Sequence, residues 1–435
     1  MAARETALNV LLACRKEGGW SNGVLKDYLL RDKLDSREAA LATRICYGVL
    51  QSRNKLDFYL KQLLTGKLKD LHPALRDILH IGLYQLYEMD KIPDSAVVNE
   101  AVRQAKSYCR KIKTASGLVN GVLRSAVRTR GTLEEPKTLS DKYSHPQNLI
   151  NLLTAYVGTE RLEAMLQANN APVAMVVQVN TLKTTCQKLQ ETLAGEGVQT
   201  QPHPWLQNCL ILSGTGNVER LESFQTGLFY VQDAAAKLSV LCAGVKPGDN
   251  VLDCCAAPGG KSFAAAMQGA GEIISCDIHP HKIGLIKNGA QRLGVSNLQA
   301  QVWDAATFCS QWEQKMDVVL CDVPCSGYGI IRKKPDIRYK DPDTMQELPK
   351  LQLEILSNQA KYVKPDGVLL YSTCTLVRRE NEGIVEKFLK VNPDFYLEKL
   401  NLPNDFPENT VGMLTLVPGE YDTDGFFIAR LRRRK

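Results

Sequence analysis

The sequence contains no Cys-x-x-Cys pair, although it has 13 cysteines, and only two of its six histidines, His279 and His281, lie close together. A structural zinc site needs such spacing, so we expect no metal centre. The cysteines are scattered and odd in number, which argues against a disulfide framework and favours reduced thiols in a cytoplasm. No apolar run approaches the length of a bilayer, and the first residues lack the features of a signal peptide. We therefore expect a cytoplasmic protein that contacts no membrane.

Charge is spread unevenly along the chain. Residues 1–130 carry 23 lysines and arginines against 13 acidic residues, a net charge of +10, whereas the whole chain of 435 residues carries +7. The remainder is therefore slightly acidic. A basic segment favours a polyanion such as nucleic acid as its partner, although a merely solvated basic surface would have the same composition.

The length allows two or three domains. Residues 1–130 place apolar residues at helical spacing, which predicts a helical bundle. A polar segment, residues 131–144, is expected to be a linker. Residues 145–230 begin with a helical pattern and continue with short alternating segments such as 175–180, which predicts a small α/β domain.

Residues 231–435 alternate strand-like and helical segments, which predicts a parallel sheet covered by helices on both faces. The expected strands are 250–253, 272–277, 318–322 and 367–372. Ligands of such sheets bind beyond the carboxyl ends of the strands. The distinctive residues of this sequence follow those ends.

A loop with two glycines joins the first expected strand to a helix. Its segment Gly259-Gly260-Lys261-Ser262 looks like the end of a phosphate-binding loop, but that pattern needs glycine at position 255, which is Cys255. What remains is a loop whose backbone N–H groups can approach a ligand at a helix N-terminus. Asp277 ends the next strand and can accept hydrogen bonds from ribose hydroxyls, while Asp304 could accept one from an adenine amine. These residues predict an adenosine pocket, unless either carboxylate only caps a helix.

Cys325 and Cys374 each follow an expected strand, whereas Cys321 lies within one and is typical of a small buried residue. C5 of cytosine is a poor nucleophile and can accept a methyl group only after a thiolate has added to C6. A second thiol could then assist product release. Asp322 precedes Cys325 and could hydrogen-bond N3 and the amino group of such a base, although it could equally cap a turn. The pair of cysteines therefore predicts pyrimidine methylation.

A basic segment follows Cys325 and is interleaved with tyrosines. A segment of this kind beside a target pocket suits a phosphate backbone, and a solvated surface is the alternative. Its basic residues are Arg332, Lys333, Lys334, Arg338 and Lys340.

These motifs resemble those of the bacterial RNA cytosine-5 methyltransferases, most closely the RsmB family, which methylates small-subunit ribosomal RNA. The segments that carry the resemblance are 230–236, 253–262, 322–327 and 372–375, together with 92–102 and 118–124, which look like a NusB-type RNA-binding domain. The resemblance implies a multidomain fold. It would combine an all-α NusB-like helical bundle (1–130), a small α/β ferredoxin-like domain (145–230) and an α/β Rossmann-like class I methyltransferase domain (231–435).

The resemblance also implies the roles of the site residues. Cys374 would attack C6 and Cys325 would help to release the product, an order that the residues alone leave open. The cofactor would be S-adenosylmethionine, and the partner small-subunit ribosomal RNA. Nothing in the sequence requires a metal, an obligate protein partner or more than a monomer. The residues expected around S-adenosylmethionine are Cys255, Ala256, Ala257, Pro258, Gly259, Gly260, Lys261, Asp277, Asp304 and Asp322.

Other functions remain open at this point. The same chemistry could act on transfer RNA or on large-subunit ribosomal RNA. A DNA cytosine methyltransferase would use the cysteine after the proline, Cys325, as its nucleophile. A noncatalytic RNA-binding factor would need neither thiol, and an adenine N6 methyltransferase is disfavoured because Cys374 stands where an aromatic residue would stack on the base.

Overall fold

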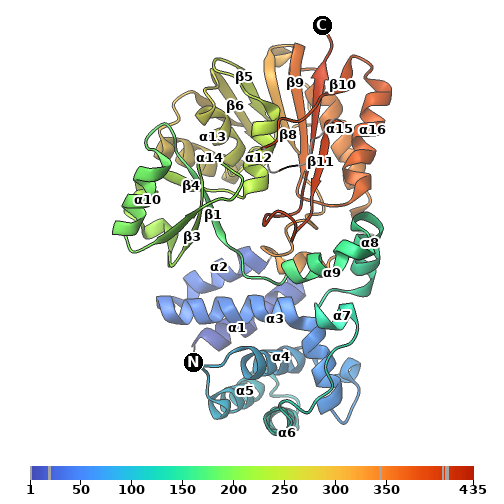
Figure 1. Ribbon diagram of the computed structural model, residues 1–435. Coiled ribbons are helices and arrows are strands. Elements are labelled where there is room, and N and C mark those ends of the chain that lie inside the picture. The colour runs from blue at the N-terminus through green and yellow to red at the C-terminus, as the bar shows by residue number, and fades with distance from the viewer. Residues whose placement is uncertain (1, 18–20, 342–344, 404–405, 407–410) are drawn as a thin grey trace. The chain divides into compact units, whose positions relative to one another are not determined.

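The computed structural model describes residues 2–17, 21–341, 345–403, 406 and 411–435 (Figure 1). The chain forms two compact units. The first, which we call the helical unit, consists of residues 1–155 and 333–340, and the second, the sheet unit, of residues 156–332 and 341–435. The helical unit thus extends beyond residues 1–130 and includes a segment from far along the chain, and the domain limits stated above remain a prediction.

The helical unit is built from amphipathic helices whose aliphatic faces form one core. Its helices are α1 (Ala2–Glu17), α2 (Ser21–Asp32), α3 (Ser36–Leu63), α4 (Pro73–Glu88), α5 (Asp94–Tyr108), α6 (Ala115–Arg128), α7 (Leu139–Lys142) and most of α8 (Gln147–Val157). The core includes a paired buried carboxylate. Asp57 of α3 accepts hydrogen bonds from Arg76 and His80 of α4, and although burial raises the pKa of Asp57, these bonds lower it to about 2.

The segment 333–340 corrects one prediction. Arg338 lies in a short 3-10 helix, Pro335–Tyr339, and is almost fully buried in the helical unit. It donates hydrogen bonds to the carbonyl oxygens of Gln51 and Ser144, and the Tyr339 hydroxyl donates to the carbonyl of Leu50. Carbonyl oxygens that have no partner within a helix or loop bind a buried guanidinium well. A side chain held in this way cannot reach a phosphate backbone, so the role of Arg338 is structural.

The first part of the sheet unit is a small antiparallel sheet with strand order β2-β3-β1-β4. Its strands are β1 (Met175–Val179), β2 (Gln199–Pro202), β3 (Cys209–Ser213) and β4 (Phe229–Val231). The helices of this part are α9 (Thr159–Ala168), α10 (Cys186–Gly195) and α11 (Glu222–Gln225). Leu189 and Leu193 of α10 pack on Val177 and Leu210 of the sheet, which gives this part its own core.

A large sheet follows, with strand order β10-β12-β9-β8-β5-β6-β7 and β11 beside β12. The strands are β5 (Asn250–Asp253), β6 (Glu272–Asp277), β7 (Leu298–Val302), β8 (Met316–Asp322), β9 (Val363–Thr373), β10 (Phe395–Leu397), β11 (Met413–Leu416) and β12 (Phe426–Arg433). Strands β5 to β9 are parallel, whereas β12 is antiparallel to β9, β10 and β11. The expectation of a parallel sheet thus holds for its centre and not for its C-terminal edge, because helical crossovers fix the direction of the central strands only.

Both faces of the large sheet are covered. Its helices are α12 (Ala234–Ala243), α13 (Gly260–Met267), α14 (Pro280–Leu293), α15 (Leu348–Ala360) and α16 (Glu382–Val391). Alternate residues of β8 face opposite cores: Val318 and Leu320 pack with α12 and α13, while Val319 and Cys321 pack with α15 and α16. Figure 1 shows these two pairs of helices on opposite sides of the sheet. The continuous apolar run of β8 is explained by burial on both faces.

No helix in the described ranges is both long enough and apolar enough to cross a membrane.

Candidate active site

The carboxyl ends of five neighbouring parallel strands carry the predicted site residues. Asp277 ends β6, Asp322 ends β8, and Cys374 follows β9 directly. Asp304 stands two residues beyond β7, and the glycine loop follows β5. The order β7-β6-β5-β8-β9 therefore arranges these groups along one edge of the sheet, from the carboxylates of the predicted adenosine pocket to the two cysteines.

The loop between β5 and α13 depends on its two glycines. Gly259 has φ of 110°, and a Cβ there would lie 2.5 Å from the ring of Phe263. A Cβ on Gly260 would lie 2.9 Å from the amide nitrogen of Gln232. The loop is fixed to the next strand by a hydrogen bond of 2.7 Å from the N–H of Ala256 to the carbonyl of Cys276. This geometry brings bare backbone to the first turn of α13, where N–H groups have no partner within the helix.

A buried network that sequence reasoning missed lies beneath this loop. Asp253 is fully buried, accepts a hydrogen bond of 2.7 Å from the Ser262 hydroxyl, and has its other carboxylate oxygen without a partner. The Ser275 hydroxyl donates in turn to Ser262 at 2.7 Å. Burial raises the pKa of Asp253 to about 6. The network ties the start of α13 to β5 and β6 through residues that are separated in the sequence.

The two predicted pocket carboxylates differ in exposure. Asp277 is buried, accepts a hydrogen bond of 3.0 Å from the N–H of His279, and lies 3.6 Å from the Lys282 ammonium. Asp304 is exposed and accepts a hydrogen bond of 2.9 Å from the N–H of Ala306. Each therefore makes the local turn contact that was the alternative interpretation, through one oxygen, and the bonds found leave the second oxygen available to a ligand.

Lys261 was predicted to line the cofactor pocket, and its side chain reaches the carboxylate of Asp322. Its ammonium lies 2.6 Å from Asp322, whose other oxygen accepts a hydrogen bond of 2.8 Å from the Ser372 hydroxyl. Burial lowers the pKa of Lys261, and the charge of Asp322 more than offsets this, so that the pKa is raised from its ordinary value. Lys261 and Cys374 also interact electrostatically. A cation is thus held beside both Asp322 and the cysteine after β9.

The two loop cysteines meet. The sulfur atoms of Cys325 and Cys374 lie 3.3 Å apart, although the residues are separated by 49 positions in the chain. The hydrogen bond with Cys374, together with burial, raises the pKa of Cys325 well above the ordinary value of a thiol. Cys325 is therefore a neutral thiol at pH 7, able to donate a proton toward Cys374.

A dipeptide that sequence reasoning did not select fixes both cysteine loops. The buried carboxylate of Glu380 accepts hydrogen bonds from the N–H of Ser326 at 2.9 Å and from the amide of Gln352 at 3.0 Å. The neighbouring Asn381 accepts from the Thr373 hydroxyl at 2.6 Å and donates to the carbonyl of Thr375 at 3.0 Å.

The two cysteine loops are also joined directly, because the hydroxyls of Ser326 and Thr375 lie 2.7 Å apart. Ser326 follows Cys325, while Thr373 and Thr375 flank Cys374. We call Glu380 and Asn381 the loop clamp. Their positions seven and eight residues after β9 gave no sequence signal, since polar residues near a helix start are common.

Other cysteines at this edge of the sheet are not poised to react. The sulfur of Cys255 lies 3.9 Å from that of Cys254, and this contact together with burial raises the pKa of Cys255. None of the cysteines forms a disulfide. Across the described residues, no group of three or more His, Cys, Asp or Glu side chains is arranged to hold a metal ion.

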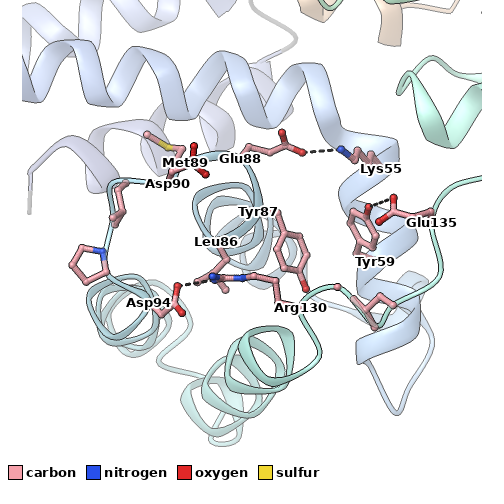
Figure 2. A pocket seen from close by; sticks show the side chains of 14 residues that line it. Lys55, Tyr59, Leu86, Tyr87, Glu88, Met89, Asp90, Asp94, Arg130 and Glu135 are labelled. Carbon is pink, nitrogen blue, oxygen red and sulfur yellow. Dashed lines mark hydrogen bonds and ion pairs between the residues drawn. The ribbon is translucent and has the colours of Figure 1, made fainter.

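The helical unit contains a pocket of about 670 Å³ at the end of α4, drawn in Figure 2. Its two cations are paired: Lys55 lies 2.8 Å from Glu88, and Arg130 lies 2.7 Å from Asp94. The Tyr59 hydroxyl donates to Glu135 at 2.8 Å. These groups satisfy one another, and none of the predicted site residues belongs to this unit.

Three family models match the chain. One described as 16S rRNA methyltransferase RsmB/F matches residues 240–432, and one described as the NusB family matches residues 1–128. A third, the ferredoxin-like domain of RsmF/B-like methyltransferases, matches residues 145–219. They confirm the predicted fold class and its order along the chain.

Similar proteins extend over the full length. A probable ribosomal RNA small subunit methyltransferase B of Bacillus subtilis is 35% identical, covering 100% of this chain and 99% of its own. Ribosomal RNA small subunit methyltransferase B of Vibrio cholerae is 34% identical over 93% of this chain and 92% of its own. The crystal structure of the protein PH0851 has a TM-score of 0.81 and 26% identity, covering 100% of this chain and 98% of its own. The chain belongs to the 16S rRNA methyltransferase RsmB/F family.

Proposed function

We propose that this protein transfers the methyl group of S-adenosylmethionine to C5 of one cytosine in small-subunit ribosomal RNA, through a covalent bond between Cys374 and C6. The observation that carries the proposal is the 3.3 Å approach of Cys325 and Cys374 beside the Asp322 and Lys261 pair. A reaction that used one cysteine alone would not explain why the two sulfur atoms lie so close together.

The residues at the sheet edge fit S-adenosylmethionine. The free oxygen of Asp277 suits a ribose hydroxyl, that of Asp304 suits the adenine amine, and the glycine loop allows close backbone approach. The predicted holders of the cofactor are Cys255 to Lys261, Asp277, Asp304 and Asp322, with Lys261 acting through its ion pair with Asp322. When bound, S-adenosylmethionine supplies an electrophilic methyl group on a positively charged sulfur.

The thiol pair supports the assignment of roles. Cys374 as thiolate adds to C6 and makes C5 nucleophilic, and C5 then accepts the methyl group. Burial and the hydrogen bond with Cys374 raise the pKa of Cys325, so Cys325 stays a protonated thiol. In the last stage a water molecule takes the C5 proton, and the electron pair of the C5–H bond restores the C5–C6 double bond. The bond between Cys374 and C6 breaks at the same time, and Cys325 donates its proton to the departing thiolate. This order favours the RNA enzyme over a DNA enzyme that attacks with the cysteine after the proline.

The Lys261 ammonium, held by Asp322, stabilises the developing charge. Addition of a thiolate at C6 places negative charge on the pyrimidine at N3 and O2. Asp322 is held by Lys261 and Ser372 at the carboxyl end of β8, three residues before Cys325, where its carboxylate can accept a hydrogen bond from the amino group of the base. The target nucleotide must be unstacked for C6 to be reached.

The proposal is tested by transfer of labelled methyl from S-adenosylmethionine to unmodified small-subunit ribosomal RNA, followed by digestion and identification of the labelled nucleoside. Label in 5-methylcytidine at one position is the expected result. Label on transfer RNA or large-subunit RNA alone would replace the substrate, and label in a nucleoside other than 5-methylcytidine would refute the mechanism.

A further inference from the structure

A pocket of about 820 Å³ in the sheet unit is remote from the predicted cofactor loop. It is lined by the connection between β2 and β3, by α12, and by Met267 and Gln268 at the end of α13. The glycine loop lies at the other end of α13, eight residues away, a separation of about 12 Å along the helix. We call this cavity the β2–β3 pocket. No role in the proposed reaction accounts for it.

The β2–β3 pocket contains a buried cation for which the described residues supply no partner. Lys237 of α12 is 7% exposed, and within the described ranges its ammonium group makes no hydrogen bond and no ion pair. The described residues that line the pocket include no aspartate or glutamate. Burial lowers the pKa of Lys237 to about 8, so the group is still charged at pH 7. An unpaired buried charge is costly, which points to an anionic ligand as its partner.

A second polar group in the wall of the pocket is also unsatisfied. His203 is 5% exposed, and neither of its ring nitrogens has a hydrogen-bond partner. Burial lowers its pKa, so the ring is neutral and can both donate and accept. Asp233 and Asp422 act on His203 electrostatically without bonding to it. A ligand with its own donor and acceptor groups would complement this histidine.

The rest of the wall combines apolar and uncharged polar side chains. Trp205 packs edge to face against His203, with ring centroids 4.5 Å apart, and Leu241 and Met267 add aliphatic surface. Asn208 contributes an amide. A planar heterocycle packs well on an indole ring, and base stacking of this kind is used widely in single-stranded nucleic acid binding.

Taken together, the geometry points to a nucleotide site. We propose that the β2–β3 pocket binds a nucleoside monophosphate unit, with the phosphate at Lys237 and the base against Trp205. The volume suits one nucleotide. The unit comes either from an RNA strand or from a free nucleotide, two sources with the same chemistry. The proposal does not depend on the methyl transfer described above, because none of these residues takes part in it.

The test is calorimetric titration of the full-length protein, saturated with S-adenosylhomocysteine to occupy the cofactor site. The titrants are the four 5′-mononucleotides, the matching nucleosides, inorganic phosphate and a single-stranded RNA octamer. At least one mononucleotide is expected to bind ten or more times more tightly than its nucleoside and than phosphate alone. Lys237→Met should weaken that binding at least tenfold and leave S-adenosylmethionine binding unchanged.

Two controls keep a folding defect apart from a lost contact. Lys246→Met removes an exposed lysine between α12 and β5 and should bind as the wild type does. Lys237→Met removes an unpaired buried charge, so its melting temperature should equal or exceed that of the wild type without ligand. Tighter binding of the octamer, with crosslinks in residues 203–209, would identify RNA as the source, and binding of mononucleotides alone would identify a free nucleotide. Equal binding by Lys237→Met and wild type, or no binding of any nucleotide, would overturn the proposal.

Discussion

Lys261 and Lys237 are two lysines of the sheet unit with little exposure that differ in what surrounds the ammonium group. Lys261 lies 2.6 Å from the Asp322 carboxylate, and its pKa is raised. Lys237 faces no carboxylate among the described residues that line its pocket, and its pKa is lowered to about 8. Lys261 is therefore held as a cation by a carboxylate of the chain, whereas Lys237 is available to an anionic ligand. A partner within the chain indicates a role in positioning, whereas a missing partner indicates a site for a ligand.

The largest effect is expected at the site that contains Lys261, Asp322 and Cys374. Cys374→Ala removes the proposed nucleophile and should lower methyl transfer by at least about 1000-fold. Binding at the β2–β3 pocket should be unaffected, since no residue of that pocket contacts Cys374. The measurement is initial rate of labelled methyl transfer beside calorimetric titration with a mononucleotide. Retention of a tenth or more of the activity would exclude Cys374 as the nucleophile.

Replacing each lysine by methionine should move stability in opposite directions. Lys261→Met leaves Asp322 without its cation and should lower both the free energy of unfolding, by about 1–3 kcal/mol, and the rate of methyl transfer, by about 100-fold. Lys237→Met should not lower the stability. Urea unfolding and methyl transfer of both variants check this. A loss of stability in both Lys261→Met and Lys237→Met would show that the two lysines do not differ in pairing.

The loop clamp should have a smaller effect. Glu380→Gln keeps the size of the side chain but weakens the acceptor for the N–H of Ser326 and the amide of Gln352. Because the clamp acts through Cys325 and Cys374, we expect kcat to fall by about 10-fold with little change in KM. Glu386→Gln is the matched control, since Glu386 is an exposed residue of α16 whose partner, Arg378, is also exposed. An unchanged kcat in Glu380→Gln would show that the clamp does not position the thiols.

The pH dependence of stability should differ between the wild type and Lys237→Met. The pKa of Lys237 is about 8 in the folded chain and lies near 10.5 ordinarily, and Cys209 is the titratable group that acts on it. The unfolded chain therefore binds more protons above pH 8, so stability rises with pH in that range, by about 1 kcal/mol between pH 8 and pH 9 for this one group. The difference between wild type and Lys237→Met in urea unfolding should change by this amount. An equal pH response of the two proteins would contradict the unpaired state of Lys237.

Much of the fold could be predicted from the sequence because its signals are local. The apolar segments at 250–253 and 272–277 became β5 and β6 with the expected limits. Cys325 and Cys374 could be placed in loops at one edge, since parallel strands align their carboxyl ends. The antiparallel direction of β12 was not predicted, because strand direction depends on the connection and not on the residues of the strand itself.

The rest depends on contacts between residues far apart in the chain. Lys261 and Asp322 are 61 positions apart, and Ser326 and Glu380 are 54 apart. No periodicity reports such pairs, so the sequence assigned Lys261 to the cofactor alone and overlooked the loop clamp. The same limit explains Arg338, which was expected at a phosphate backbone and is instead bound to two carbonyls of the helical unit. The role of Lys237 could not be predicted, because a sequence does not show whether a lysine has a charged partner.

The central claim is that two thiols share the reaction, with Cys374 forming the bond to C6 and Cys325 releasing it. The most direct test incubates Cys325→Ala, Cys374→Ala and the double variant with S-adenosylmethionine and small-subunit ribosomal RNA, then separates the products on a denaturing gel. We expect a protein–RNA adduct that resists denaturation in Cys325→Ala alone, because the base is methylated but the bond between Cys374 and C6 is not broken. An adduct in Cys374→Ala, or none in Cys325→Ala while it still methylates at the wild-type rate, would contradict it.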